Sequence, residues 1–314
     1  MQDLQRRRRQ SAIQKRKNKN ILKLCRWGVN QPPICFYGWS KVFKSRYNII
    51  ALLLAISFAL MCKTVEVEET GSAENGVYVL CYHSFTNFPH EITFPIKQLD
   101  LQMKTLKDAG FNFITTEDLI AKRYKGLNNV LITIDDGHGS VYKAYHEVFK
   151  RYNIKPLIAI FPMIISRKNY ALTWEQITEL HKEGCCIAAH GYYYIYTDAI
   201  SYKRNPDMCR DEVTKSKEML ESKLDFKIDA FVYPYGYHYH EIVKLVEETG
   251  YKFGFTIEPG VVFRNDPNIN RFEMPRYMIT NHNVHQIFKL MFKSINKTYE
   301  HNWELSVHHR RKKN

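Results

Sequence analysis

From residue 77 onward, short apolar runs alternate with longer segments of mixed polarity. The runs are rich in β-branched residues, as in Val-Leu-Ile-Thr-Ile at 130–134, which is typical of buried strands. Between them apolar residues recur every three or four positions, which is typical of amphipathic helices. We expect strands at 77–81, 111–115, 130–134, 156–161, 186–189, 230–233, 253–257 and 273–280. Helices are expected at 94–110, 141–152, 173–184, 207–223, 239–249 and 283–296.

This alternating order predicts βα units and a parallel sheet. About seven units in roughly 230 residues favour a closed barrel over an open, doubly wound sheet. No glycine-rich loop follows the first expected strand, so a dinucleotide site is not expected. We predict an α/β fold: a distorted (β/α) barrel of about seven parallel strands, preceded by an N-terminal transmembrane helix.

The membrane segment is expected from an uncharged apolar run of 14 residues at 49–62. Basic residues precede this run and acidic residues follow it, an asymmetry typical of a helix whose basic end stays in the cytoplasm. The run is shorter than the roughly 17–25 residues of a usual span. A cleaved signal peptide and a buried core helix are therefore alternatives to an uncleaved signal anchor at 48–63.

Charge is distributed unevenly along the 314 residues, whose formal net charge is +14. Residues 1–47 hold 13 Lys and Arg against one acidic residue, whereas 63–309 hold 29 basic and 31 acidic residues. The main domain is thus nearly neutral, and no nucleic-acid partner is expected. We divide the chain into a basic, disordered cytoplasmic segment at 1–47, the anchor at 48–63, a linker at 64–76, the barrel domain at 77–298 and a basic tail at 299–314. The protein would be membrane-anchored, with its barrel outside the cytoplasm, in the periplasm or at the cell surface.

The candidate chemistry lies at the ends of the expected strands. In a parallel barrel these ends meet at one face, where catalytic residues of such folds lie. Two adjacent carboxylates repel each other unless a cation or a divided acid/base role relieves the repulsion. A solvated Asp-Gly turn is the simpler alternative for that pair. The polar residues at these positions are His83, Asp135, Asp136, His190, Tyr233, Tyr235 and Arg276.

Three of these segments resemble motifs of the polysaccharide deacetylase family, the NodB-homology or carbohydrate esterase 4-like domain. Residues 133–137 read Thr-Ile-Asp-Asp-Gly, and 231–236 read Phe-Val-Tyr-Pro-Tyr-Gly. Tyr82-His83 at the first strand resembles another family position. The resemblance covers roughly 77–290 and is closest to the branch that deacetylates poly-β-1,6-N-acetylglucosamine.

The resemblance implies a role for each matching residue. Asp135 is the general base that activates water, with Arg276 orienting it. Asp136 and His190 are ligands of a divalent metal ion, with zinc the expected ion. The backbone N–H of Tyr235 stabilises the oxyanion. The substrate-binding residues are assigned as His83, Tyr194 and Tyr233.

The sequence departs from the family at the second metal-binding His, where Tyr194 and Ile195 stand. A catalytic zinc usually has three protein ligands. His83 or His138 would supply the third, or Tyr194 would coordinate through its phenolate, or the site holds no metal. We therefore expect a metal-dependent N-deacetylase of an envelope or exported N-acetylglucosamine-type polysaccharide. The alternative is a catalytically degenerate domain that binds glycan without hydrolysis.

Overall fold

The computed structural model describes residues 75–88 and 90–297, all of which belong to the unit Glu68–Asn314. Within these residues, no helix is both long and apolar enough to cross a membrane. The expected segments at 1–47, 48–63 and 299–314, and nearly all of the linker at 64–76, lie outside the described residues. Gly76, assigned to the linker, belongs to the first strand instead.

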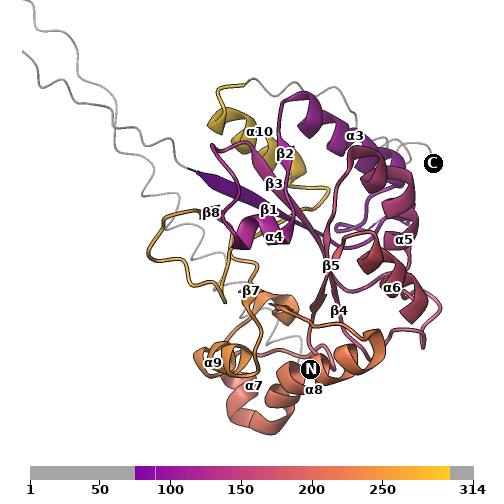
Figure 1. Ribbon diagram of the computed structural model, residues 1–314, viewed down its shortest axis with the longest axis vertical. Helices are drawn as coiled ribbons and strands as arrows, with labels where there is room; N and C mark the ends of the chain where they lie inside the picture. Colours follow the sequence, from indigo (N-terminus) through magenta and orange to yellow (C-terminus); the bar gives the residue numbers. More distant parts are fainter. Residues whose placement is uncertain (1–74, 89, 298–314) are drawn as a thin grey trace, which may run out of the picture. The chain divides into compact units, whose positions relative to one another are not determined.

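One curled sheet of nine strands forms the centre of the domain (Figure 1). Its main order is β7-β6-β5-β4-β3-β1-β8, and every pairing is parallel except that of β1 with β8. The strands are β1 (Gly76–Tyr82), β2 (Asn112–Phe113), β3 (Asn129–Ile134), β4 (Leu157–Ile160), β5 (Cys186–Ala189), β6 (Ala230–Val232), β7 (Phe253–Phe255), β8 (Val261–Phe263) and β9 (Tyr277–Met278). The predicted parallel α/β sheet is therefore present.

The segment around β9 connects the two sides of the curled sheet. Met274 forms a parallel bridge with Phe255 of β7, and Tyr277 and Met278 of β9 pair with β1. This arrangement is consistent with the distorted barrel that the sequence predicts. Strand β9 is much shorter than the expected 273–280, because Pro275 has no N–H to donate to a neighbouring strand.

The helices follow one another around the outside of the curled sheet, from α10 and α3 through α5 and α6 to α8 and α9 (Figure 1). They are α3 (Ile96–Asp108), α4 (Thr116–Ile120), α5 (Ser140–Ala144), α6 (Trp174–Lys182), α7 (Ala199–Arg204), α8 (Pro206–Leu224), α9 (His240–Glu248) and α10 (Val284–Ser294). Helix α5 continues into the short turns η1 (Tyr145–Phe149) and η2 (Lys150–Tyr152), and η3 (Pro234–Gly236) follows β6. Helix α6 begins at the predicted capping box, in which Thr173 and Gln176 exchange hydrogen bonds.

Three short elements were not predicted: α4, α7 and β8. Helix α4 starts at a capping box of Thr115 and Asp118, so the strand expected at 111–115 ends early and keeps only two residues as β2. Helix α7 has a single side-chain cap from Asp198. These elements are too short for periodicity to show in the sequence.

Alternate residues of each strand pack into two separate clusters, as expected when successive side chains point to opposite faces. One face packs against the helices and includes Leu80, Ile132, Ile158, Ile187 and Phe231. The other face lines the inside of the curl and includes Val79, Leu131, Ala159, Ala188, Val232 and Phe255. This alternation decides which polar residues at the strand ends point inward.

Candidate active site

Five polar side chains occupy the next inward-facing positions, beyond the apolar residues that line the inside of the curl. Cys81 and His83 follow Val77 and Val79, Asp135 follows Leu131 and Thr133, His190 follows Ala188, and Arg276 follows Met274. All five are buried. The strands thus bring together residues separated by long stretches of sequence, at the carboxyl end where the predicted site lies.

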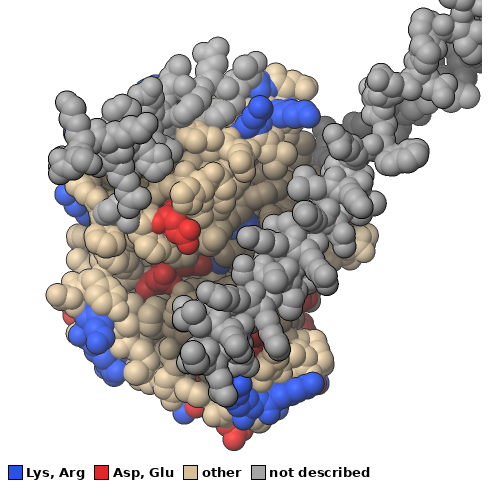
Figure 2. All heavy atoms as spheres, turned by 180° about the vertical axis from the view of Figure 1, so that it is seen from behind, with Lys and Arg blue, Asp and Glu red and all other residues tan. Residues whose placement is uncertain are grey.

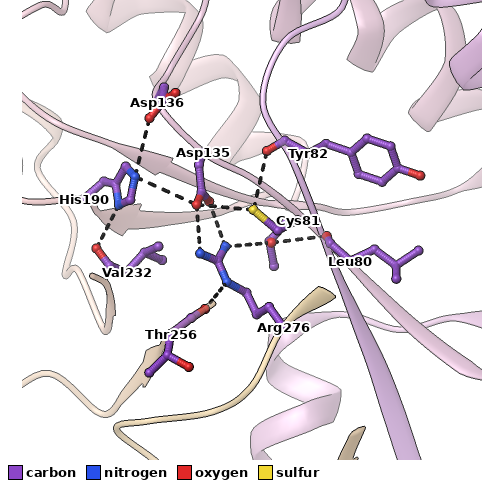
Figure 3. A network of polar contacts seen from close by, with 10 residues as sticks. Leu80, Cys81, Tyr82, Asp135, Asp136, His190, Val232, Thr256 and Arg276 are labelled. Atoms are coloured by element: carbon purple, nitrogen blue, oxygen red, sulfur yellow. Dashed lines mark hydrogen bonds and ion pairs between the residues drawn. The ribbon is translucent and has the colours of Figure 1, made fainter. Parts of the chain in front are cut away.

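Arg276 and Asp135 form a bidentate ion pair at the centre of this group (Figure 3). Nη1 and Nη2 of Arg276 each donate to one carboxylate oxygen of Asp135 at 2.8 Å. Arg276 also donates to the carbonyl oxygen of Thr256 at 2.8 Å and to Oγ1 of Thr133 at 2.9 Å. Burial alone would raise the pKa of Asp135, but the Arg276 charge outweighs it and holds the pKa far below its usual range. Asp135 is therefore ionised at neutral pH.

His190 lies beside both carboxylates, with Nε2 at 3.5 Å from Oδ1 of Asp136 and 3.8 Å from Oδ2 of Asp135. Its Nδ1 donates to the carbonyl oxygen of Val232 at 2.8 Å, which leaves Nε2 to face Asp136. Burial lowers the pKa of His190, but the charge of Asp135 and the contact with Asp136 raise it overall. A fixed Nδ1–H is also how histidine ligands are usually oriented toward metals.

Asp136 does not follow the inward–outward alternation of strand side chains, because its backbone adopts φ 74°. Gly137 follows with φ 69°. This left-handed turn points the Asp136 carboxylate in a different direction from that of Asp135. Oδ1 of Asp136 is buried without a hydrogen-bond partner among the described residues. The simple solvated turn is thus excluded for this pair.

Cys81 and His83 complete the inward group on β1 and just after it. Sγ of Cys81 lies 3.4 Å from Oδ2 of Asp135, and burial raises the pKa of the Cys81 thiol well above its usual value. Nδ1 of His83 is buried and unpaired among the described residues, and burial lowers the pKa of His83. Donor atoms of Cys81, His83 and Asp135 all lie within 4.8 Å of one another, so this group could hold a metal ion.

The loop after β5 is held by a buried carboxylate that sequence reasoning missed. Oxygens of Glu212, on α8, accept hydrogen bonds from the backbone N–H groups of Tyr192, Tyr193 and Tyr194 at 2.7–3.1 Å. Burial raises the pKa of Glu212 to about 7, against the opposing effect of these donors. Gly191 permits this approach, since a Cβ there would lie 2.0 Å from Oε2 of Glu212.

The Glu212 contacts fix Tyr194 beside the carboxylates, in a left-handed conformation with φ 65°. The Tyr194 ring packs edge-on to His190 with centroids 5.2 Å apart, and it stacks on Phe161 at 4.7 Å. Burial, followed by the charge of Asp136, raises the pKa of the Tyr194 phenol strongly. Tyr194 is therefore a neutral phenol next to Asp136.

The predicted Tyr233 and Tyr235 lie at the turn after β6. Tyr233 is buried, its hydroxyl has no partner among the described residues, and burial raises its pKa. Tyr235 lies in η3 with φ 58° and has an exposed ring. Its N–H belongs to the first turn of η3, where N–H groups have no partner within the turn. An available N–H is what the predicted oxyanion role requires.

A cavity of about 250 Å³ opens over these residues, and His83, Asp136, His138, Tyr170 and Tyr194 contribute to its lining. A larger cavity of about 450 Å³ lies near the opposite ends of the strands, beside Lys155, Cys186 and Phe253. It includes none of the predicted site residues. We therefore place the site at the smaller cavity, because His83 and Asp136 line it and Asp136 contacts the buried His190.

The predicted metal ligands fit two of the three positions of a catalytic zinc site. The 3.5 Å between His190 Nε2 and Asp136 Oδ1 suits two ligands that each lie about 2.0–2.2 Å from one ion. Oδ1 of Asp136 has no hydrogen-bond partner among the described residues, which supports this role. However, the described residues contain no other His, Cys, Asp or Glu donor within 4.8 Å of both atoms. Nδ1 of His138 is instead 2.8 Å from Oγ of Ser140. The three-ligand set is therefore incomplete, and both ligand roles stay predictions.

Comparison with known proteins agrees with this arrangement. A family model described as polysaccharide deacetylase matches residues 122–254, which include Asp135, Asp136, His190 and Tyr235. The chain therefore resembles the polysaccharide deacetylase family over this segment. This resemblance supports the predicted class of enzyme, a hydrolase that acts on carbon–nitrogen bonds.

Two curated relatives and two solved structures illustrate the relationship. YxkH of Bacillus subtilis, a polysaccharide deacetylase homologue, is 29% identical over 191 residues, which are 60% of this chain and 66% of that protein. A poly-β-1,6-N-acetyl-D-glucosamine N-deacetylase of Staphylococcus aureus is 22% identical over 77% of this chain and 96% of its own length. IcaB from Ammonifex degensii shares the fold with a TM-score of 0.62, at 24% identity over 69% of this chain and 97% of its own. The Streptococcus pyogenes deacetylase PplD has a TM-score of 0.58, at 20% identity over 65% of this chain and 92% of its own.

Proposed function

We propose that this chain removes N-acetyl groups from an N-acetylglucosamine-type polysaccharide of the cell envelope or an exported one. The observation that carries the proposal is the buried Asp135–Arg276 pair, in which Oδ2 of Asp135 lies 3.8 Å from Nε2 of His190. The neighbouring Asp136 lines the cavity. The names of the staphylococcal relatives support the choice of glycan. An amide is a weak electrophile, so its hydrolysis needs both an activated water and a stabilised oxyanion.

Asp135 would accept the proton of the attacking water. Its Oδ2 already faces Nη2 of Arg276 and Sγ of Cys81, whereas Oδ1 faces only Nη1 of Arg276 within the described residues. Because a carboxylate oxygen has two lone pairs, Oδ1 retains one for a water. Arg276 keeps the carboxylate ionised and fixes its orientation. The N–H of Tyr235 would donate to the oxyanion, and the products are acetate and a free amine.

The proposed function includes a divalent metal ion, with zinc as the expected ion, which Asp136 and His190 would bind. When bound there, it would polarise the acetyl carbonyl. His190 would be held for this purpose by its Nδ1–H bond to Val232. His83, whose Nδ1 has no partner among the described residues, lines the cavity and would contact the substrate. Tyr233, also predicted as a substrate contact, is instead fully buried in the cluster that packs against the helices and does not line the cavity.

The cellular setting is a further part of the proposal. A signal anchor at 48–63 would attach the protein to a membrane with the barrel domain outside the cytoplasm. The charge asymmetry around the apolar run supports this orientation.

A second function is favoured by one specific observation. Tyr194, a neutral phenol, stands where the family places a second metal-binding His. A chain with this substitution would bind glycan without hydrolysing it.

Acetate release distinguishes the two functions. The full-length chain, purified in detergent, is incubated with N-acetylglucosamine oligosaccharides of β-1,6 and β-1,4 linkage, with and without added zinc. Hydrolysis predicts acetate release, and Asp135→Asn should slow it by about 10²- to 10⁴-fold. Asp108→Asn, at an exposed carboxylate paired with Lys104, is the matched control and should leave the rate unchanged. Glycan binding without acetate under any of these conditions would establish the second function instead.

A further inference from the structure

The larger cavity, of about 450 Å³, lies where the strands begin, at the end of the sheet opposite to the candidate active site. It is bounded by Cys186, the first residue of β5, by Phe253, the first residue of β7, and by residues of helix α4. Its volume is within the usual range for small-molecule sites, which is about 300–1,000 Å³. The proposed function makes no use of this cavity, so its lining has to be explained separately.

Several side chains that line this cavity are apolar. Ile120 of α4, Ile187 of β5 and Phe253 of β7 contribute to the lining. The ring of Phe226 also lines the cavity and stacks on the ring of His181, with centroids 3.6 Å apart and an interplanar angle of 13°. These groups suit the hydrocarbon portion of a ligand.

Two buried polar atoms of lining residues have no hydrogen-bond partner of standard geometry within residues 75–88 and 90–297. They are Oγ1 of Thr116, a residue that is 4% exposed, and Nδ1 of His181. Oγ1 of Thr116 lies beside the thiol of Cys186, which is only a weak hydrogen-bonding group. Because an unpaired buried polar atom is unfavourable, a ligand that supplies partners for these atoms would gain affinity.

The charged side chains of the lining favour an anion. Four of them are basic and two are acidic: Arg123, Lys155, Lys227 and Lys252, against Glu117 and Asp229. Arg123, Lys227 and Lys252 each pair with a carboxylate. Lys155 makes no ion pair in the described part of the chain, and its Nζ donates instead to the hydroxyl of Tyr145 at 2.9 Å. Its charge is therefore available to a ligand.

Thr116 and Lys155 both adjoin residues 184–186, which brings them to the same part of the cavity. Thr116 lies beside Cys186, and the stem of Lys155 lies against Gly184, where a Cβ would be 3.5 Å from Cδ of Lys155. On the face drawn in Figure 2, Lys and Arg are scattered among other residues and form no continuous patch in the part that is not grey. A local basic group of this kind suits a small anion, since a polyanion needs a continuous basic surface.

We propose that this cavity binds a small organic acid that has a compact apolar body and one carboxylate. The carboxylate would accept hydrogen bonds from Oγ1 of Thr116 and from a protonated Nδ1 of His181, and Lys155 would supply the opposite charge. The apolar body would lie against Ile187 and Phe253. This site does not depend on the proposed hydrolysis, since the two share no residue.

Calorimetry with a matched pair of ligands tests this proposal. Cyclohexanecarboxylate has the carboxylate and the apolar body, whereas cyclohexanecarboxamide has nearly the same shape without the charge. Each is titrated into the full-length chain in detergent near pH 7. The carboxylate should bind about tenfold tighter than the carboxamide, as expected for hydrogen bonds to a charged group. Equal affinity for the two compounds, or binding of neither, would overturn the proposal.

Two substitutions locate the carboxylate within the cavity. Lys155→Gln should remove most of the tenfold preference by weakening the carboxylate alone. Thr116→Val, which keeps the shape and removes the hydroxyl, should weaken both compounds, because an amide oxygen also accepts hydrogen bonds. The matched control is Lys244→Gln, at an exposed lysine of α9 that does not line the cavity, and it should change neither Kd. Circular dichroism verifies that each variant retains the fold, and a preference that survives Lys155→Gln would contradict the site.

Asp136→Ala separates this cavity from the candidate active site, where polar groups also line a cavity. The preference for cyclohexanecarboxylate should be the same in Asp136→Ala as in the parent. Its loss in this variant would assign the carboxylate to the candidate active site and overturn the proposal.

Discussion

Arg276 donates a hydrogen bond to each carboxylate oxygen of Asp135, although 141 positions of sequence separate the two residues. Arg276 is 1% exposed and Asp135 is 3% exposed, so neither charge can be satisfied by water if the other is removed. The pair is therefore a stability element as well as the predicted catalytic base with its orienting partner.

Replacing Arg276 with methionine should destabilise the protein by about 3–5 kcal/mol near pH 7, since it leaves a buried charge unpaired. The paired Asp135 has a lower pKa when folded than when unfolded, so its contribution is present above the unfolded pKa and is lost as pH falls through the folded pKa. Without Arg276, the pKa of Asp135 rises. The difference in the free energy of unfolding between parent and variant should therefore become smaller below about pH 4, where Asp135 of the variant is protonated. Urea unfolding near pH 7 and below about pH 4 measures this difference.

The exposed Arg123, which pairs with Glu117 and Asp118, gives the control Arg123→Met. Its unfolding curve should stay close to that of the parent. A loss for Arg276→Met that is equal at neutral and acid pH would contradict the assignment of the effect to the Asp135 charge.

Replacing Tyr194 with histidine should complete the metal site. Histidine tolerates positive φ better than most residues, so the backbone at φ 65° should accept it. Because residues behind a ligand change metal affinity by about 10–100-fold, a new direct ligand should raise zinc affinity at least about tenfold. Calorimetry with zinc measures this, and Tyr194→Phe, which adds no donor, is the control. Equal zinc affinity in both variants would show that position 194 does not face the ion.

Two groups compete as the metal site, and alanine substitutions separate them. Cys81 belongs to the Cys81–His83–Asp135 group, whereas His190 faces Asp136. The guanidinium of Arg276 already engages Asp135, so we expect the ion at Asp136 and His190. His190→Ala should abolish bound metal, while Cys81→Ala should leave it nearly unchanged. Elemental analysis measures the metal content of the two purified variants. Metal lost in Cys81→Ala but kept in His190→Ala would assign the metal site to the Cys81 group instead.

Replacing Glu212 with glutamine should release the loop that carries Tyr194. Both oxygens of Glu212 accept backbone N–H groups, so the amide NH₂ of glutamine must face a donor. We expect a loss of about 1–3 kcal/mol from such an unsatisfied buried group. Glu218→Gln, at an exposed position of the same helix α8, is the control and should cost little.

Glu212 also predicts a pH dependence of stability. Its folded pKa of about 7 lies above the ordinary glutamate pKa of 4.5, so the folded state holds the proton more tightly. The free energy of unfolding should therefore decrease as pH rises from about 4.5 to 7. In Glu212→Gln, the contribution of residue 212 to this decrease in the free energy of unfolding should be absent. In Glu218→Gln, the decrease should be the same as in the parent. Identical slopes in both variants would argue against a raised pKa.

The sequence predicts those parts of the site that depend on strand ends. Asp135 and His190 directly follow apolar runs, and a parallel sheet must bring such positions to one face. Arg276 was predicted from the same logic although it lies beyond the matched segment 122–254. The conformations of Asp136 and Tyr194 were not predictable, because left-handed backbone at non-glycine residues has no clear sequence signal.

Glu212 and Cys81 were missed for different reasons. Glu212 lies on the helix α8, where a single acidic residue resembles a solvated one until its backbone partners are known. The residue in the sequence that relates most directly to this contact is Gly191, whose φ of 76° allows the loop after β5 to approach the Glu212 carboxylate. Cys81 ends the apolar run expected as the first strand, and nothing in that run indicates that its thiol faces Asp135.

The segment that joins β7 to β1 through Met274 and β9 also carries Arg276, and it is among the last parts of the domain to leave the ribosome. Until it docks, Asp135 has no counter-charge. A chain interrupted before residue 274 would contain both carboxylates and His190 but not the arginine that would orient the predicted base. The proposed activity would then depend on completed synthesis, so truncated products should be inactive rather than partly active.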